Sequence, residues 1–389
     1  MKKIWCSVAV FMALIRAVPG QQVLSPHYEV IGGTGTAAES PVDTGEMEAF
    51  AREMEGRFSV YTQLFRFDPA RLDAPLKVRI IKDGGAYNSY VSSRLGGERP
   101  GAVYIHYQDA ARRELVIHRG GAEENRVLPY QAFIQYLRTF IPNPPSWLRE
   151  GFAIYFTTLG YSSEGELKYS ENLSWLEAAK AVGDGVPPLE SLFLADQGDE
   201  PENFRALSWA LVSFFLNSGN EDYFRSLIEA FMLLSPAADA AQNSQTVTEH
   251  LGRWGDFTLM RTDFLSYLDS RKTFLEFMSE GQAAYAAKDA FTAEYSFMSA
   301  MNQKPEHYAP YYYLGLLAYE NGRHDQAEQY YKRSIENGAD RALVLYALGI
   351  NALSAGKNGD AVTFLRQAAD LSPERYRAKA NDLIKKLEG

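Results

Sequence analysis

The feature that most constrains the fold of this chain is an internal repeat of 34 residues in its C-terminal third. Small or turn-forming residues recur at this spacing in four columns: Gly281, Gly315 and Gly349; Ala293, Ala327 and Ala361; Ala300, Ser334 and Ala368; and Pro305, Ala339 and Pro373. Self-similarity with a period of about 20–50 residues is typical of folds that stack one supersecondary unit repeatedly. The repeat therefore predicts a helical solenoid, in which each unit contacts only its neighbours.

This pattern resembles the tetratricopeptide repeat, which places small residues where two helices cross and a proline at the turn. The resemblance implies three units, at residues 274–307, 308–341 and 342–375, and a polar capping helix at residues 376–389. It also implies a concave groove formed by the first helix of each unit. The groove positions are apolar or tyrosine-rich and include Tyr285, Tyr312, Leu316, Tyr319, Tyr346 and Ile350.

The groove positions contain no Lys or Arg, so the Lys/Asn clamp with which chaperone-binding repeats hold a carboxylate is absent. Two alternatives remain for such a lining. It binds an apolar or aromatic segment of another protein, or it buries a helix of its own chain.

A second motif lies in the middle of the chain, where residues 145–156 read PSWLREGFAIYF. This segment resembles the P-x-W-L-x-E-G-x-A-x-Y-F helix of peptidase-MA-like (gluzincin) zinc proteases. In that family the glutamate, here Glu150, is the third zinc ligand. The preceding helix of the family carries H-E-x-x-H, and the matching stretch here runs from Tyr130 through Gln131 to Ile134. The resemblance covers roughly residues 27–270 and departs from the family at these ligand positions.

The departure removes the chemistry of a zinc protease. Zinc requires imidazole, carboxylate or thiolate donors, and Ile134 has no donor atom, while Tyr130 is neutral near pH 7. Gln131 cannot accept a proton from a metal-bound water as a glutamate does. We therefore expect no metal site, no cofactor and no catalysis at these vestigial positions. Tyr130 and Ile134 should fill apolar volume, and Glu150 should hydrogen-bond with the Tyr130 hydroxyl or the Gln131 amide.

Local patterns predict the elements of this first part of the chain. An amphipathic helix should begin at Asp43, because Met47, Phe50, Met54, Phe58, Tyr61 and Phe65 recur at helical spacing. Strands are expected at residues 27–31, 76–81, 103–105 and 114–118. A metal site improvised from His106, His118 and Glu150 is an alternative that the sequence leaves open.

The ends and the composition bound the remaining possibilities. Lys2, Lys3 and the apolar run from Ile4 to Ile15 resemble a secretory signal peptide over residues 1–20, with cleavage before Gln21. A retained signal anchor is the alternative. The one cysteine, Cys6, lies inside this run, so the mature chain would lack disulfides. The net charge of −10 argues against nucleic acid or an anionic membrane as the main partner.

These observations predict an α+β chain. After the signal peptide, a degenerate gluzincin-like domain at residues 21–270 should precede an all-α solenoid of tetratricopeptide repeats. The expected function is non-catalytic binding or scaffolding of a protein or peptide through the groove, in a periplasmic or secreted setting, with no membrane span in the mature chain. The alternative is a zinc metallopeptidase or another hydrolase with non-standard ligands around Glu150.

Overall fold

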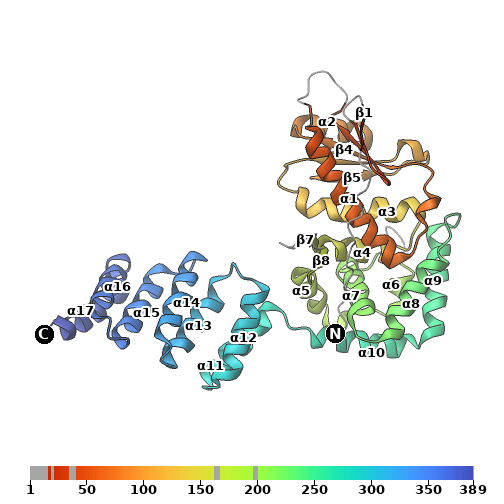
Figure 1. The fold of residues 1–389 in the computed structure, drawn as a ribbon. Coiled ribbons are helices and arrows are strands. Elements are labelled where there is room, and N and C mark those ends of the chain that lie inside the picture. The colour runs from red at the N-terminus through yellow and green to blue at the C-terminus, as the bar shows by residue number, and fades with distance from the viewer. Residues whose placement is uncertain (1–15, 19–21, 35–40, 162–166, 196–199, 389) are drawn as a thin grey trace. The chain divides into compact units, whose positions relative to one another are not determined.

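The computed structural model describes residues 16–18, 22–34, 41–161, 167–195 and 200–388. The chain forms two compact units, Met1–Ser270 and Arg271–Gly389 (Figure 1). Most of the expected signal peptide, residues 1–15 and 19–20, lies outside the described residues. Within the described part of the chain, no helix is long and apolar enough to cross a membrane.

The first unit contains a mixed sheet, which in the described residues has the strand order β1-β2-β3-β4-β6-β5. The central strands β3, β4 and β6 run parallel, whereas β5 pairs with β6 in the antiparallel sense and forms one edge. The four strands expected from sequence are present. The bounds of the sheet strands are Arg16–Val18 (β1), Gln22–Leu24 (β2), Tyr28–Gly32 (β3), Leu76–Ile81 (β4), Ala102–Ile105 (β5) and Glu114–His118 (β6).

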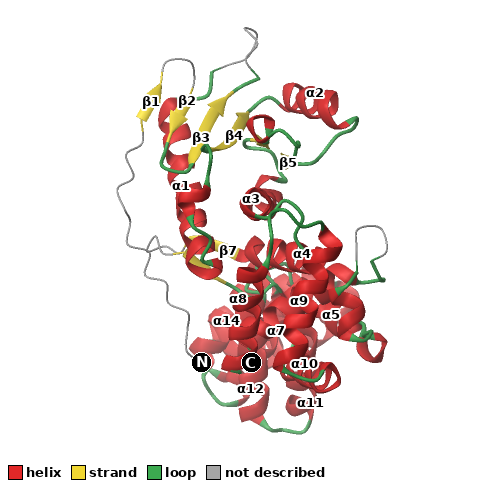
Figure 2. Cartoon of the chain, turned by 90° about the vertical axis from the view of Figure 1, so that its right-hand side faces the viewer, coloured by secondary structure: helices red, strands yellow, loops and turns green. Residues whose placement is uncertain are grey.

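Alternation along β4 separates the two faces of this sheet. Val78 and Ile80 point into the main core, whereas Lys77 and Arg79 lie on the opposite face, because successive side chains of a strand point to opposite sides. Helix α1 (Thr44–Phe65) covers the core face and runs against β2 and β3 (Figure 2). Helix α2 (Gly84–Leu95) packs on the other face.

Helix α1 confirms the amphipathic pattern predicted from sequence. Its N-cap is Asp43, whose carboxylate accepts a hydrogen bond from the backbone N–H of Glu46. Every member of the predicted apolar stripe is buried, and the stripe meets the aromatic side chains of α3 (Glu124–Phe140). Rings from α1 and α3 pack at centroid distances such as 5.4 Å between Tyr61 and Phe133. This contact places α3 between the sheet and the helical half of the unit.

The rest of the first unit is helical apart from a hairpin of β7 (Leu159–Tyr161) and β8 (Leu167–Tyr169). The helix α7 is apolar around most of its circumference, which explains why it lies at the centre of this half. The helices are α4 (Ser146–Tyr155), α5 (Leu173–Ala181), α6 (Leu189–Phe193), α7 (Phe204–Asn217), α8 (Glu221–Leu233), α9 (Ala240–Trp254) and α10 (Phe257–Ser270).

The second unit consists of three antiparallel helix pairs and a final helix, as the 34-residue period predicts (Figure 1). The pairs are α11 (Phe274–Ala286) with α12 (Ala290–Gln303), α13 (Tyr308–Glu320) with α14 (His324–Glu336), and α15 (Arg341–Ser354) with α16 (Asn358–Leu371). The capping helix α17 (Pro373–Glu388) begins three residues before position 376, because Pro373 is suited to the first turn of a helix.

The repeated glycines have a direct packing reason. A Cβ placed on Gly281 would lie 2.6 Å from the ring of Phe297, and one on Gly315 would lie 2.5 Å from the ring of Tyr331. In the third pair Gly349 meets Leu365 in the same way, at 2.7 Å. The absence of a side chain in the first helix therefore allows a large one in the second to pack closely, once in every unit.

Candidate functional site

A cleft in the first unit surrounds Glu150. It has a volume of 1030 Å³ and is lined by side chains from α3, α4, α5 and α7 and from the edge strand β5. That volume lies at the upper end of the roughly 300–1,000 Å³ usual for ligand sites. Four arginines and two glutamates line it: Arg99, Arg126, Arg149, Arg205, Glu150 and Glu200. The lining thus carries a net charge of +2 in a chain whose total charge is −10.

Gly151 fixes the position of Glu150. A Cβ at Gly151 would lie 2.4 Å from the backbone oxygen of Ser208, so α4 and α7 approach more closely than any other residue would allow. This contact accounts for the Glu-Gly pair in the sequence motif. It brings Glu150 and the N-terminal part of α7, including Arg205, to the same cleft.

The carboxylate of Glu150 is held by three donors. The hydroxyl of Tyr130 donates a hydrogen bond of 2.6 Å to Oε2, which Arg205 Nε approaches at 3.2 Å. Arg149 Nε lies 3.2 Å from Oε1. The Arg205 guanidinium also lies over the rings of Tyr130 and Trp175, at 5.5 and 5.6 Å from their centroids. The predicted contact between Tyr130 and Glu150 is confirmed.

The surroundings of Tyr130 keep its phenol protonated. Burial raises the pKa of the Tyr130 phenol well above its ordinary value, and the charge and hydrogen bond of Glu150 raise it further. Tyr130 therefore remains a neutral donor near pH 7 and cannot act as a base. Two guanidinium groups and the Tyr130 hydroxyl thus contact the Glu150 carboxylate.

Gln131, the other candidate partner of Glu150, makes a different hydrogen bond. Gln131 Oε1 instead accepts a hydrogen bond of 3.0 Å from the backbone N–H of Tyr104 on β5. Because β5 is an edge strand of the sheet, its outward N–H groups need partners. Gln131 satisfies one of these donors and so blocks the place where an extended peptide would pair with the strand.

Ile134 lies in the main core with 8% of its surface exposed, as expected for a residue that fills volume. Tyr130 is only partly buried, since it packs against this core and also lines the cleft. The two positions thus differ: Ile134 lies in the core, and Tyr130 forms part of the wall of the cleft.

The improvised metal site does not form. His118 stacks on Tyr87, and His106 Nδ1 lies 3.4 Å from the hydroxyl of Tyr104, so each histidine contacts residues other than Glu150. Burial lowers the pKa of His106 to about 4, with smaller contributions from Arg138 and Arg113. Within the described residues there is no group of three or more His, Cys, Asp and Glu side chains that could hold a metal ion.

The predicted groove residues lie on the first helices of the three pairs, α11, α13 and α15. All six, Tyr285, Tyr312, Leu316, Tyr319, Tyr346 and Ile350, are half-buried. Burial raises the pKa of the Tyr285, Tyr312 and Tyr346 phenols, which stay neutral near pH 7. The hydroxyl of Tyr285 donates to Glu320 on the next unit, and Tyr319 accepts a 3.3 Å hydrogen bond from Ser354.

The capping helix covers part of this row. Tyr376 of α17 stacks on Tyr346 with ring centroids 4.9 Å apart, so a helix of the same chain occupies the end of the row at the third unit. Sequence reasoning missed this contact, and it missed Arg205 and Trp175 in the cleft of the first unit. Tyr376, Arg205 and Trp175 lie far in sequence from the residues that they contact, and no local motif indicated these contacts.

No protein-family model matches the chain, and no curated protein matches it either. Among solved structures, it is similar to the Arabidopsis OM64 TPR domain, with 19% identity and a TM-score of 0.28 over 29% of this chain and 93% of the other. It is also similar to YrrB, described as a TPR protein with an unusual peptide-binding site, with 15% identity and a TM-score of 0.29 over 55% of this chain and 92% of the other.

Proposed function

We propose that this chain is a non-catalytic binding protein, whose tetratricopeptide-like helix pairs hold a segment of another protein. The observation that carries the proposal is a row of half-buried apolar and tyrosine side chains at equivalent positions of neighbouring units. Tyr285 and Tyr319 are 34 residues apart, as are Tyr312 and Tyr346, and Leu316 and Ile350.

Stacking of structurally similar units supports a continuous surface, because equivalent positions then lie side by side. Rings and aliphatic groups that are only half-buried retain apolar area that a partner can remove from water. The third unit contributes less, since Tyr376 already stacks on Tyr346. The free part of the row is therefore centred on Tyr312, Leu316 and Tyr319.

The charges favour a partner segment that combines apolar and basic residues. Glu320 lies beside the row, and its carboxylate accepts the hydrogen bond from Tyr285. The whole chain carries a charge of −10, which would speed the approach of a basic segment. Apolar side chains of the partner would supply the affinity and basic ones the specificity.

The test compares two double variants of the full chain. Leu316→Ala with Tyr319→Ala removes the centre of the row. Phe291→Ala with Tyr295→Ala is the matched control, because these side chains of α12 are 84% and 60% exposed and lie outside the row. Selection of displayed random peptides should enrich apolar and basic residues and should be lost only in the first variant. Circular dichroism checks that both variants are folded, and retention of the same peptides by the first variant would refute the proposal.

We further infer that the first unit is an inactivated peptidase-MA-like domain. The support is the placement of Glu150, the motif's ligand position, 2.6 Å from the hydroxyl of Tyr130 at the first former histidine position. The hydrolase alternative is disfavoured, because two guanidiniums hold Glu150 and Gln131 occupies the edge strand. Elemental analysis of the purified protein should find no stoichiometric zinc. If one zinc per chain is found and is lost in the variant Glu150→Gln, the hydrolase alternative is supported instead.

Export through the N-terminal signal peptide remains part of this proposal. Cleavage before Gln21 would remove strand β1, which pairs with β2 at one edge of the sheet. The strands β2 to β6 and the core that they cover would remain. The proposed setting is the periplasm or the exterior of the cell.

A further inference from the structure

A second pocket lies on the face of the sheet that carries α2, opposite the face covered by α1 and α3. The alternation of β4 directs Lys77 and Arg79 to this side, and the alternation of β6 directs Glu114 there. The pocket has a volume of 250 Å³ and is lined by these three side chains together with Arg94, Arg112 and Tyr107. It shares no lining residue with the cleft at Glu150.

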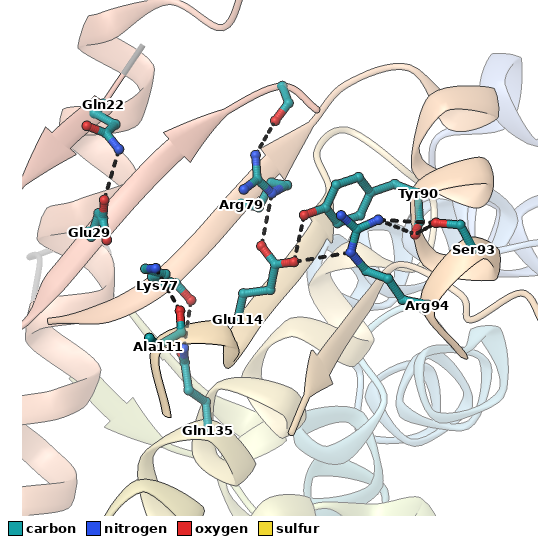
Figure 3. Close-up of polar contacts among 11 residues, drawn as sticks. Gln22, Glu29, Lys77, Arg79, Tyr90, Ser93, Arg94, Ala111, Glu114 and Gln135 are labelled. Carbon is teal, nitrogen blue, oxygen red and sulfur yellow. Dashed lines mark hydrogen bonds and ion pairs between the residues drawn. The ribbon is translucent and has the colours of Figure 1, made fainter. Parts of the chain in front are cut away.

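Glu114 orients the two innermost arginines of the pocket (Figure 3). Its Oε2 accepts a hydrogen bond of 3.0 Å from Arg79 Nε, and its Oε1 accepts one of 2.6 Å from the Tyr90 hydroxyl and lies 3.6 Å from Arg94 Nε. The guanidinium carbons of Arg94 and Arg79 lie 3.4 and 5.0 Å from the centroid of the Tyr90 ring. Further hydrogen bonds join Arg79 Nη1 to the Gly33 oxygen and Arg94 Nη1 to the Tyr90 oxygen.

The charge of this pocket is strongly unbalanced. Its lining contains four cationic side chains, Lys77, Arg79, Arg94 and Arg112, and one carboxylate, Glu114, which gives +4 − 1 = +3. Lys77 Nζ donates to the backbone oxygen of Ala111 at 2.8 Å, and Arg112 lies 4.4 Å above the ring of Tyr107. Neither cation has an acidic partner among the residues that the structure describes. Such a concentration of positive charge is unexpected in a chain with a net charge of −10.

We propose that this pocket binds a tetrahedral oxyanion with two negative charges, a phosphoryl or sulfate group, between Lys77, Arg79, Arg94 and Arg112. Guanidinium forks match the geometry of such oxygens, and an ammonium adds a point charge. The buried Glu114 carboxylate is a positioning group that fixes the orientation of Arg79 and Arg94 before the ligand arrives. A site of this volume is smaller than the roughly 300 Å³ at which pockets for whole drug-sized ligands begin. It therefore suits the anionic group of a larger molecule.

The net charge of the lining decides between kinds of anion. A monovalent carboxylate would leave two of the three excess charges uncompensated, whereas a divalent oxyanion leaves one. The Tyr90 hydroxyl does not compete with the ligand, because it is directed to Glu114. Burial, followed by the hydrogen bond to Glu114, raises the pKa of Tyr90 to about 12, so that this side chain adds no negative charge near pH 7.

The experiment titrates the full chain with inorganic phosphate by isothermal calorimetry at low salt, with acetate as the monovalent comparison. The variant Lys77→Gln with Arg112→Gln removes two exposed or half-exposed cations and keeps the Glu114 cluster. Arg52→Gln with Arg253→Gln is the control, since both side chains are exposed and lie outside the pocket. We expect saturable phosphate binding that exceeds acetate binding. Affinity should fall by about tenfold for each pocket cation removed and remain unchanged in the control.

Two further probes distinguish the source of the group. Glycerol 3-phosphate tests a soluble phosphate ester, and phosphatidylcholine vesicles with and without phosphatidic acid test a lipid headgroup. Loss of either interaction in Lys77→Gln with Arg112→Gln supports the site and identifies its ligand class. The proposal is overturned if phosphate, the ester and the vesicles all fail to bind. It is also overturned if the pocket variant binds phosphate as tightly as the control variant does.

Discussion

Replacing Gly151 by alanine should loosen the contact that positions Glu150. The added Cβ would lie 2.4 Å from the Ser208 backbone oxygen, 2.7 Å from Val212 Cγ2 and 2.8 Å from the Ser208 carbonyl carbon. Contacts of Cβ below 3.0 Å essentially never occur, so the first separation must increase by at least 3.0 − 2.4 = 0.6 Å. Two of the three atoms belong to the backbone of α7. The strain cannot be relieved by a side-chain rotation, and the helices must move apart.

The size of the effect follows from two opposing terms. Overpacking of a well-packed interior costs about 1–3 kcal/mol, and backbone collisions belong to the upper part of that range. Alanine favours a helix over glycine by about 1 kcal/mol, which offsets part of this cost. We expect a net loss of about 1–2 kcal/mol in the free energy of unfolding of the first unit. That loss corresponds to a fall of roughly 2–8 °C in its melting temperature.

Urea denaturation and calorimetry of the full chain would measure the loss, with Gly359→Ala as the matched control. Gly359 is also helical, but a Cβ there would meet no atom within 4 Å, so the same substitution should be neutral or stabilising by up to about 1 kcal/mol. If Gly151→Ala is as stable as the wild type, α4 and α7 are not in the close contact that the structure shows. The explanation of the Glu-Gly motif would then be wrong.

Ile134→Ala should destabilise the first unit by about 2–5 kcal/mol, because a buried side chain is replaced by a cavity; an unchanged denaturation midpoint would mean that Ile134 faces solvent. The stability of the same unit should also decline as the pH falls from about 6.5, the ordinary pKa of histidine, toward 4. Burial lowers the pKa of His106 to about 4, so the folded state favours the neutral imidazole. The stability that His106 contributes is therefore complete above the pKa of histidine in the unfolded chain. It is lost as the pH falls toward the lower pKa of His106 in the folded state. Urea titrations at several pH values should show a flatter acid limb for His106→Gln; an unaltered limb would exclude His106 as a source of the dependence.

Local patterns in the sequence determined several parts of this protein. The 34-residue period predicted three helix pairs, because glycine must recur wherever a large side chain of the second helix packs against the first. The stripe from Met47 to Phe65 predicted α1, since helical spacing places those residues on one face. The bounds of β4 and β6 also followed from their own residues, because apolar residues alternate with basic ones in β4 and form a central run of three in β6.

Apart from the hydrogen bond between Tyr130 and Glu150, only the tertiary structure decided which side chains meet. Gln131 was one of two candidate partners of Glu150, but its side-chain oxygen instead accepts a hydrogen bond from the backbone N–H of Tyr104 on the edge strand. Arg205 reaches Glu150 from a helix 55 residues further along the chain, which is possible only because Gly151 lets α7 pack against α4. Sequence periodicity specifies on which face of a helix or strand a residue lies. Which residue from a distant segment contacts it depends instead on how the helices and strands pack together. For that reason Tyr130, Ile134 and Glu150 could be singled out from sequence, whereas the arginine lining of the cleft and the cationic pocket at Glu114 could not.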